Sequence, residues 1–150
     1  MNAPERIAAV PVASQLKDAS LFQEKAFING QWVSSKANES FVVHNPATGE
    51  IIARVANMAP SDAEAAITAA HKALPAWRSK TAKERAIIVR KWFELVTAAT
   101  DDLALLMTLE QGKPLAEAKG EVAYGASFIE WFAEEAKRVQ GAVPSSTWSD

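Results

Sequence analysis

The pattern of apolar and polar positions changes about a third of the way along the chain. Up to residue 56, apolar residues form short runs separated by turn residues, which is typical of β-strands. The hairpin signal Asn29-Gly30 lies between apolar pairs at 27–28 and 32–33, and a turn at 45–50 separates the apolar runs 41–43 and 51–56. We therefore predict a small antiparallel β unit at the start of the chain.

From residue 61 onward, apolar residues recur at helical spacing. Capping boxes are predicted at 61–64 and 81–84, because a Ser or Thr there is followed three residues later by Glu. The first helix should weaken at Pro75, and acids at 101–102 begin a third helix, where they meet the positive end of its dipole. The second helix carries one apolar stripe, made of Ile88, Trp92, Leu95 and Ala99.

The longest predicted helix follows a turn at 112–114. Gly112 should end the third helix in the left-handed conformation, and Pro114 suits the first turn of the next. No proline follows before Gln140, so this helix could extend for roughly 40 Å. Gly120 and Gly125 within it suggest a close approach to its backbone. One face is apolar (Val122, Ala126, Ile129, Ala133), and the neighbouring face is aromatic (Tyr124, Phe128, Trp131, Phe132).

Composition limits the classes of protein and of partner. The chain has 150 residues and is 49% hydrophobic, which suits one globular domain or one piece of a larger domain. Its net charge of −2 and the lack of a basic stripe argue against nucleic acid as the main partner. No apolar segment is long enough to span a bilayer, and the run at 7–13 is too short for a secretory signal. We predict that residues 1–15 form a flexible tail.

The residues by themselves indicate no catalytic constellation. The chain has no cysteine, and neither His44 nor His71 has a partner at a motif spacing, so structural or surface roles are favoured for both. No Walker loop, HExxH or GxGxxG motif is present. The aromatic face of the long helix is more typical of a core than of a ligand pocket. Glu134 and Arg138 would form an ordinary helical ion pair, worth about 0.2–0.5 kcal/mol.

Several segments, taken together, resemble the NAD(P)-dependent aldehyde dehydrogenase superfamily. Within it, they are most similar to the bacterial succinate-semialdehyde dehydrogenase group, which includes glutarate-semialdehyde dehydrogenases. The segments are FINGQWV, VHNPATGEIIARVANM, AHKALPAWRSKTAKERAIIVRKWFEL, DDLALLMTLEQGKP and TLEQGKPLAEAKGEVAYGASFIEWFAEEAKR. The resemblance implies an α/β fold in which residues 16–140 form the N-terminal part of a Rossmann-like cofactor domain. Residues 141–150 would begin an oligomerisation arm.

The resemblance also implies an activity for a longer polypeptide. Members of the family oxidise aldehydes with NADP or NAD, using a cysteine nucleophile, a glutamate and an asparagine that holds the oxyanion. These groups are expected beyond residue 150, so this segment alone should be inactive. The implied reaction is oxidation of succinate or glutarate semialdehyde to the dicarboxylic acid, by a cytoplasmic homodimer or homotetramer without nucleic-acid or membrane partners. A non-enzymatic helical interaction or assembly module is the alternative.

Two sets of site residues follow from matching positions in the family. The first would line the tunnel through which the aldehyde enters, and consists of Gly120, Tyr124 and Phe128. The second would hold a monovalent cation, through the backbone oxygens of Val43 and His44 and the carboxylate of Glu110. A local hydrogen bond at the helix end is an equally good role for Glu110.

Overall fold

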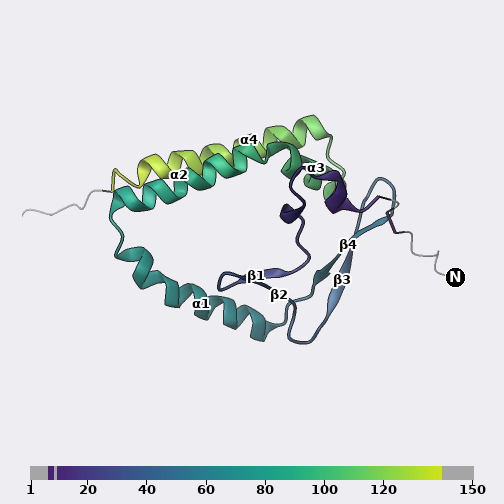
Figure 1. The fold of residues 1–150 in the computed structure, drawn as a ribbon, viewed down its shortest axis with the longest axis horizontal. Coiled ribbons are helices and arrows are strands. Elements are labelled where there is room, and N and C mark those ends of the chain that lie inside the picture. Colours follow the sequence, from purple (N-terminus) through teal and green to yellow (C-terminus); the bar gives the residue numbers. More distant parts are fainter. Residues whose placement is uncertain (1–6, 9, 140–150) are drawn as a thin grey trace, which may run out of the picture.

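The computed structural model describes residues 7–8 and 10–139, with strands first and helices after them (Figure 1). The strands are β1 (Ala26–Ile28), β2 (Gln31–Val33), β3 (Ser40–His44) and β4 (Ile51–Ala56). The helices are α1 (Pro60–Arg78), α2 (Ala82–Ala98), α3 (Thr100–Gln111) and α4 (Leu115–Glu135). Short 3-10 helices at Val12–Gln15 and Ala19–Leu21 precede them. The predicted α/β class is confirmed, and the predicted arm at 141–150 lies outside the described residues.

The strands form two separate antiparallel hairpins. In the first, β1 pairs with β2, and Asn29 and Gly30 at its tip have φ angles of 51° and 77°. These positive angles are what a two-residue hairpin turn requires, so the Asn-Gly signal predicted the turn correctly. In the second, β3 pairs with β4, with a register shift between Val43 and His44. The β unit is therefore two hairpins rather than one sheet.

Helix α1 begins before the predicted capping box. Ala59 is its N-cap residue, Pro60 lies in its first turn, and the buried Asp62 carboxylate accepts a hydrogen bond from the Ala59 N–H at 3.0 Å. The assignment of the cap to 61–64 was wrong, because proline is favoured in a first turn and moves the helix start upstream. The helix continues through Pro75, where it was expected to weaken, and ends at Arg78.

The later helices begin close to their predicted positions, but α4 is shorter than expected. The capping box at 81–84 is present, and Gly112 ends α3 with a φ of 78°. Pro114 is the N-cap of α4 rather than a first-turn residue, and α4 ends at Glu135. Its 21 residues correspond to about 32 Å instead of 40 Å. Gln140, the predicted end, lies outside the described residues.

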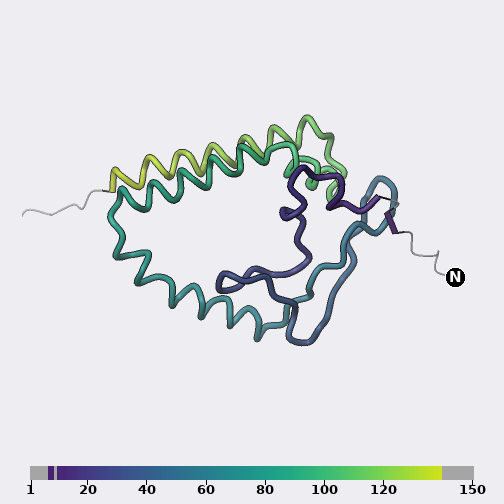
Figure 2. The backbone as a smooth tube through the Cα atoms, viewed as in Figure 1, coloured from purple at the N-terminus to yellow at the C-terminus, as the bar shows by residue number. Residues whose placement is uncertain are grey.

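Helices α2 and α4 run side by side in opposite directions, and α3 lies at one end of the pair (Figure 1). Ala104, Ala118 and Val122 form the core where α3 meets α4. Helix α1 and the β1–β2 hairpin lie on the other side of an open arrangement (Figure 2). None of the described helices has both the length and the apolar character needed to cross a membrane.

Candidate functional site

The predicted tunnel residues lie on one side of α4, because they follow one another at intervals of four residues. The rings of Tyr124 and Phe128 meet edge to face, with centroids 4.9 Å apart. Both side chains are exposed. A Cβ added at Gly120 or Gly125 would meet no atom within 4 Å. The expected close approach to these glycines is therefore not made by the described residues, and the side of the helix at Gly120 is open.

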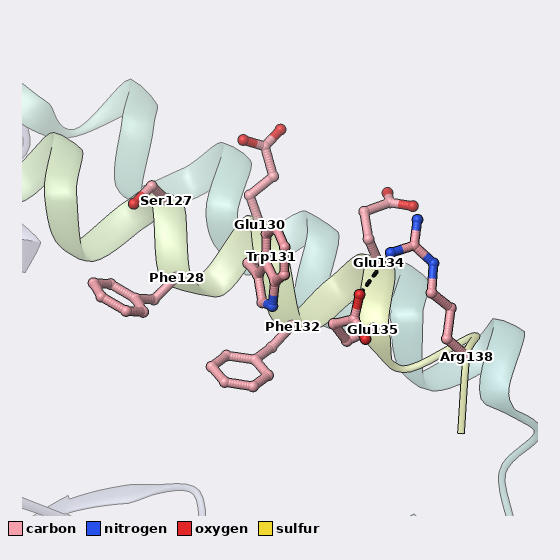
Figure 3. A pocket seen from close by; sticks show the side chains of 8 residues that line it. All are labelled: Ser127, Phe128, Glu130, Trp131, Phe132, Glu134, Glu135 and Arg138. Carbon is pink, nitrogen blue, oxygen red and sulfur yellow. Dashed lines mark hydrogen bonds and ion pairs between the residues drawn. The ribbon is translucent and has the colours of Figure 1, made fainter. Parts of the chain in front are cut away.

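A groove of about 600 Å³ lies further along α4. Three aromatic and four charged side chains line it together with one serine: Ser127, Phe128, Glu130, Trp131, Phe132, Glu134, Glu135 and Arg138 (Figure 3). Phe128 and Phe132 point toward the same side of the helix. The sequence pattern placed Trp131 and Phe132 on the aromatic face, but it did not reveal that they form a groove.

Ion pairs along α4 differ from the predicted one. Glu134 and Arg138 do not pair with each other. Instead, Glu134 pairs with Lys137 at 3.4 Å, and Glu135 pairs with Arg138 at 2.6 Å. Each of these pairs joins residues three apart on the exposed surface, so each contributes less than about 1 kcal/mol.

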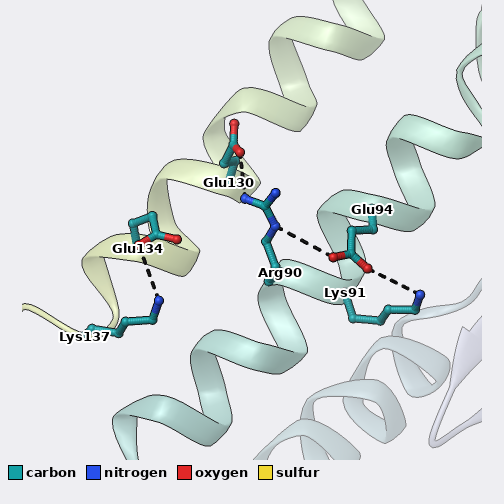
Figure 4. A network of polar contacts seen from close by, with 6 residues as sticks. All are labelled: Arg90, Lys91, Glu94, Glu130, Glu134 and Lys137. Atoms are coloured by element: carbon teal, nitrogen blue, oxygen red, sulfur yellow. Dashed lines mark hydrogen bonds and ion pairs between the residues drawn. The ribbon is translucent and has the colours of Figure 1, made fainter.

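The opposite side of α4 packs against the rest of the chain. Its buried residues are small: Ala118, Val122, Ala126 and Ala133. Three of them belong to the predicted apolar face, whose fourth member, Ile129, is half-buried. Between α2 and α4, Arg90 donates to Glu130 at 2.7 Å and lies 3.8 Å from Glu94, while its guanidinium stands 4.7 Å from the Phe93 ring centre (Figure 4). Together, these contacts orient α4 so that its aromatic face points away from the core.

The predicted cation ligands lie near two turns that touch. A Cβ added at Gly112, at the end of α3, would lie only 3.0 Å from Cγ of Pro46, in the turn after β3. This contact brings the end of the strand that carries Val43 and His44 toward the helix end that carries Glu110. The Glu110 side chain is exposed.

The predicted ligand atoms for a cation at these turns are oxygens. The His44 ring is already engaged, since its Nδ1 lies 3.2 Å from the Gly49 carbonyl oxygen and donates to it. The cation prediction concerns the backbone oxygen of His44 and not its ring. The described residues contain no group of three or more His, Cys, Asp or Glu side chains able to hold a metal. Backbone oxygens and one carboxylate suit a hard cation of low charge.

Helix α3 also binds the N-terminal segment, which sequence patterns did not reveal. The buried Asp102 carboxylate accepts hydrogen bonds from the backbone N–H groups of Lys17 and Asp18, both at 2.9 Å. The adjacent Asp101 pairs with Lys119 at 2.8 Å and Lys17 at 2.7 Å. Hydrogen bonds from Lys119 and Lys17, together with their charges, lower the pKa of Asp101 to about 2.

Comparison with known proteins gives consistent matches. Residues 32–150 match the aldehyde dehydrogenase family. Over 127 residues, the chain is 61% identical to the glutarate-semialdehyde dehydrogenase of Pseudomonas putida and 58% identical to the NADP(+) succinate-semialdehyde dehydrogenase of Escherichia coli. In both cases the match covers 85% of this chain and 26% of the relative. The chain thus spans about a quarter of the length of these relatives.

Solved structures agree with the sequence matches. An NADP-dependent enzyme from Escherichia coli superposes with a TM-score of 0.88 at 55% identity, over 90% of this chain and 28% of that chain. A succinate-semialdehyde dehydrogenase from Burkholderia pseudomallei gives a TM-score of 0.85 at 55% identity, over 88% of this chain and 27% of that chain. The open arrangement of helices and hairpins is therefore similar to part of a much longer folded chain.

Proposed function

Because this chain belongs to the aldehyde dehydrogenase family, we propose that it supplies the N-terminal part of an NAD(P)-dependent enzyme that oxidises succinate or glutarate semialdehyde to the dicarboxylic acid. The main support is its 61% identity to a relative named for glutarate semialdehyde. The cofactor is NADP or NAD, and the enzyme is a cytoplasmic homo-oligomer. This chain has no cysteine and therefore no thiol nucleophile, so its role is to bind and position.

Helix α4 forms one wall of the aldehyde entrance in this proposal. The edge-to-face rings of Tyr124 and Phe128 offer an apolar surface for the carbon chain of the substrate. The free space beside Gly120 keeps the path wide. The packing of the small residues on the other side of α4 holds these rings in place.

A monovalent cation is held at the contact between the Pro46 turn and the end of α3. Its ligands are the backbone oxygens of Val43 and His44 and the carboxylate of Glu110. The close contact between Gly112 and Pro46 supports this proposal, because it keeps the two turns together. The cation would stabilise the junction, and no chemical step depends on it.

A chimera tests the proposed reaction directly. This chain replaces the matching N-terminal segment of the Pseudomonas putida glutarate-semialdehyde dehydrogenase, and NAD(P)H formation is followed with each semialdehyde. We expect activity within about tenfold of the parent enzyme, because its catalytic groups are retained and the path to them is rebuilt. The parent enzyme and a version lacking the segment are the controls. A folded but inactive chimera would favour the alternative, a helical interaction module, for which the exposed aromatic residues are the supporting observation.

The entrance assignment is tested by Gly120→Trp in the same chimera. The indole would occupy the free space beside Tyr124, so the KM for the semialdehyde should rise by about tenfold or more while the cofactor KM stays constant. Lys91→Trp, on the exposed side of α2, is the matched control. Equal kinetics for the two variants would remove Gly120 from the entrance.

A further inference from the structure

Tyr124, the only tyrosine of the chain, carries a hydroxyl group on the proposed entrance wall. Its side chain is 67% exposed. Its backbone oxygen accepts a hydrogen bond from the Ser127 hydroxyl at 2.7 Å, whereas its own phenol hydroxyl has no partner among the described residues. A tyrosine hydroxyl usually finds a hydrogen-bond partner when its ring is enclosed. The partner of this hydroxyl is therefore expected to come from outside the described part of the chain.

The Tyr124 ring has a defined position beside open space. It meets the Phe128 ring edge to face, with centroids 4.9 Å apart and an angle of 85° between the ring planes. One turn earlier on the same side of α4, a Cβ added at Gly120 would meet no atom within 4 Å. The ring thus has an apolar neighbour on one side and free space on the other, so a small molecule can reach its hydroxyl.

The positively charged side chains on α4 and beside its ends are all engaged within this chain. Each has an acidic partner: Lys119 with Asp101, Lys113 with Glu121, Lys137 with Glu134, and Arg138 with Glu135. Over the described residues, this wall therefore offers an incoming anion no unpaired cation. A phenol hydroxyl is uncharged, donates one hydrogen bond, and binds an ionised acceptor more strongly than a neutral one.

A second donor on the same face is the indole N–H of Trp131, about two turns further along α4. It belongs to the groove of about 600 Å³, whose lining includes three glutamates and a single basic residue, Arg138 (Figure 3). Like charges repel, so the excess of carboxylates in this groove disfavours a further carboxylate. Of the two donors, Tyr124 is therefore the better site for the carboxylate of a substrate.

The proposed substrates carry a carboxylate at the end opposite the aldehyde. The next step rests on the proposed function: the aldehyde carbon enters first, toward catalytic groups in the rest of the enzyme, so the far carboxylate stays nearest to the entrance. We propose that Tyr124 is a specificity-determining residue whose hydroxyl donates a hydrogen bond to this far carboxylate. The contact with Phe128 orients the ring. Tyr124 thereby selects semialdehydes of dicarboxylic acids over uncharged aldehydes of the same length.

The test is Tyr124→Phe in the chimera, which removes the hydroxyl and keeps the ring. Kinetics are measured with glutarate semialdehyde and with pentanal, in which a methyl group replaces the carboxylate. We expect kcat/KM for glutarate semialdehyde to fall by about tenfold or more, chiefly through KM, because a hydrogen bond to a charged acceptor is lost. The value for pentanal should change by less than about twofold. Thermal unfolding should stay the same, since the ring contact with Phe128 is retained.

A second readout requires no turnover. Binding of glutarate, the reaction product, is measured by calorimetry and should weaken by about tenfold or more in Tyr124→Phe. If the parent chimera is folded but inactive and this difference in affinity persists, the proposed function fails and the role of Tyr124 stands. If glutarate affinity is also unchanged in that inactive chimera, both fail.

Two results in an active chimera would overturn the role of Tyr124 and leave the proposed function intact. The first is an equal change in kcat/KM for glutarate semialdehyde and pentanal, because the hydroxyl would then not distinguish the carboxylate. The second is a loss specific to glutarate semialdehyde in Trp131→Phe instead of Tyr124→Phe, which would place the carboxylate in the groove.

Discussion

The two ends of helix α3 and the aromatic face of α4 differ in whether this chain supplies partners for their side chains. At the α3 junction, formed by Asp101, Asp102 and Gly112 with Lys17 and Pro46, this chain supplies both members of every contact described above. On the aromatic face, large side chains remain in water. Polar groups at the junction thus find their partners within this chain, whereas the large apolar side chains of the helix layer stay exposed. The difference separates contacts that this chain completes by itself from a surface that it leaves exposed.

The largest effect expected at the junction comes from Asp102→Ala. This change leaves the N–H groups of Lys17 and Asp18 without their acceptor, which should destabilise docking of the N-terminal segment by about 2–3 kcal/mol. Hydrogen exchange of a peptide containing residues 17 and 18 in the chimera should accelerate by roughly thirtyfold or more. Glu117→Ala, which removes an exposed acid from α4, should leave that peptide unchanged. Equal exchange in both variants would show that the junction is not held by Asp102.

Alanine substitutions at two glycines should change the stability of the chimera in opposite directions. Gly112→Ala should destabilise the chimera by about 1–2 kcal/mol, because the left-handed conformation disfavours a side chain. The new Cβ would also stand 3.0 Å from the Pro46 ring. Gly120→Ala should instead stabilise α4 by up to about 1 kcal/mol, since this helical position has free space around it. Thermal unfolding of the two variants measures the difference, and shifts of the same sign would contradict the assigned roles.

Local rules predicted much of the fold. The Asn29-Gly30 turn, the capping box at 81–84 and the end of α3 at Gly112 each depend on neighbours within a few residues, and all three were predicted correctly. The start of α1 was missed because two local signals competed there. Pro60 in the first turn and Asp62 reaching back to Ala59 prevailed over the predicted box.

Contacts between distant residues could not be predicted in this way. Asp102 was expected to serve its own helix dipole, and no periodic pattern links it to Lys17, 85 positions away. The apolar stripe containing Trp92 was detected, but the pattern does not say which of two apolar sides packs within this chain. The tunnel and cation residues depended on resemblance to a family, because neither set has a motif of its own. Geometry alone would have favoured the groove lined by Trp131 and Phe132 as the candidate site.

The smallest expected effect on stability is the pH dependence that arises from the Asp101 ion pairs. The folded-state pKa of Asp101 is about 2, below its ordinary value of 3.8, chiefly through hydrogen bonds from Lys119 and Lys17. A lowered carboxyl pKa contributes stability above about pH 4, and this contribution is lost as pH falls toward 2. The pKa of Lys17 is raised by the same partner, so its contribution is present at neutral pH and lost as pH rises through that raised value. Asp101→Asn should therefore flatten both the acid and the alkaline limbs of the stability profile.

The pH dependence should also distinguish the α3 junction from the aromatic face of α4. Hydrogen exchange of residues 17–18 in the chimera, followed from pH 2 to pH 5 after correction for intrinsic rates, should depend less on pH in Asp101→Asn than in the parent. Added salt should reduce the same dependence, because both ion pairs are exposed to solvent. Hydrogen exchange of a peptide from α4 that contains Phe132 should be insensitive to this substitution, since apolar contacts carry no proton. A shift in both readouts would mean that the junction and the aromatic face are coupled through α4, on which Lys119 and Phe132 both lie.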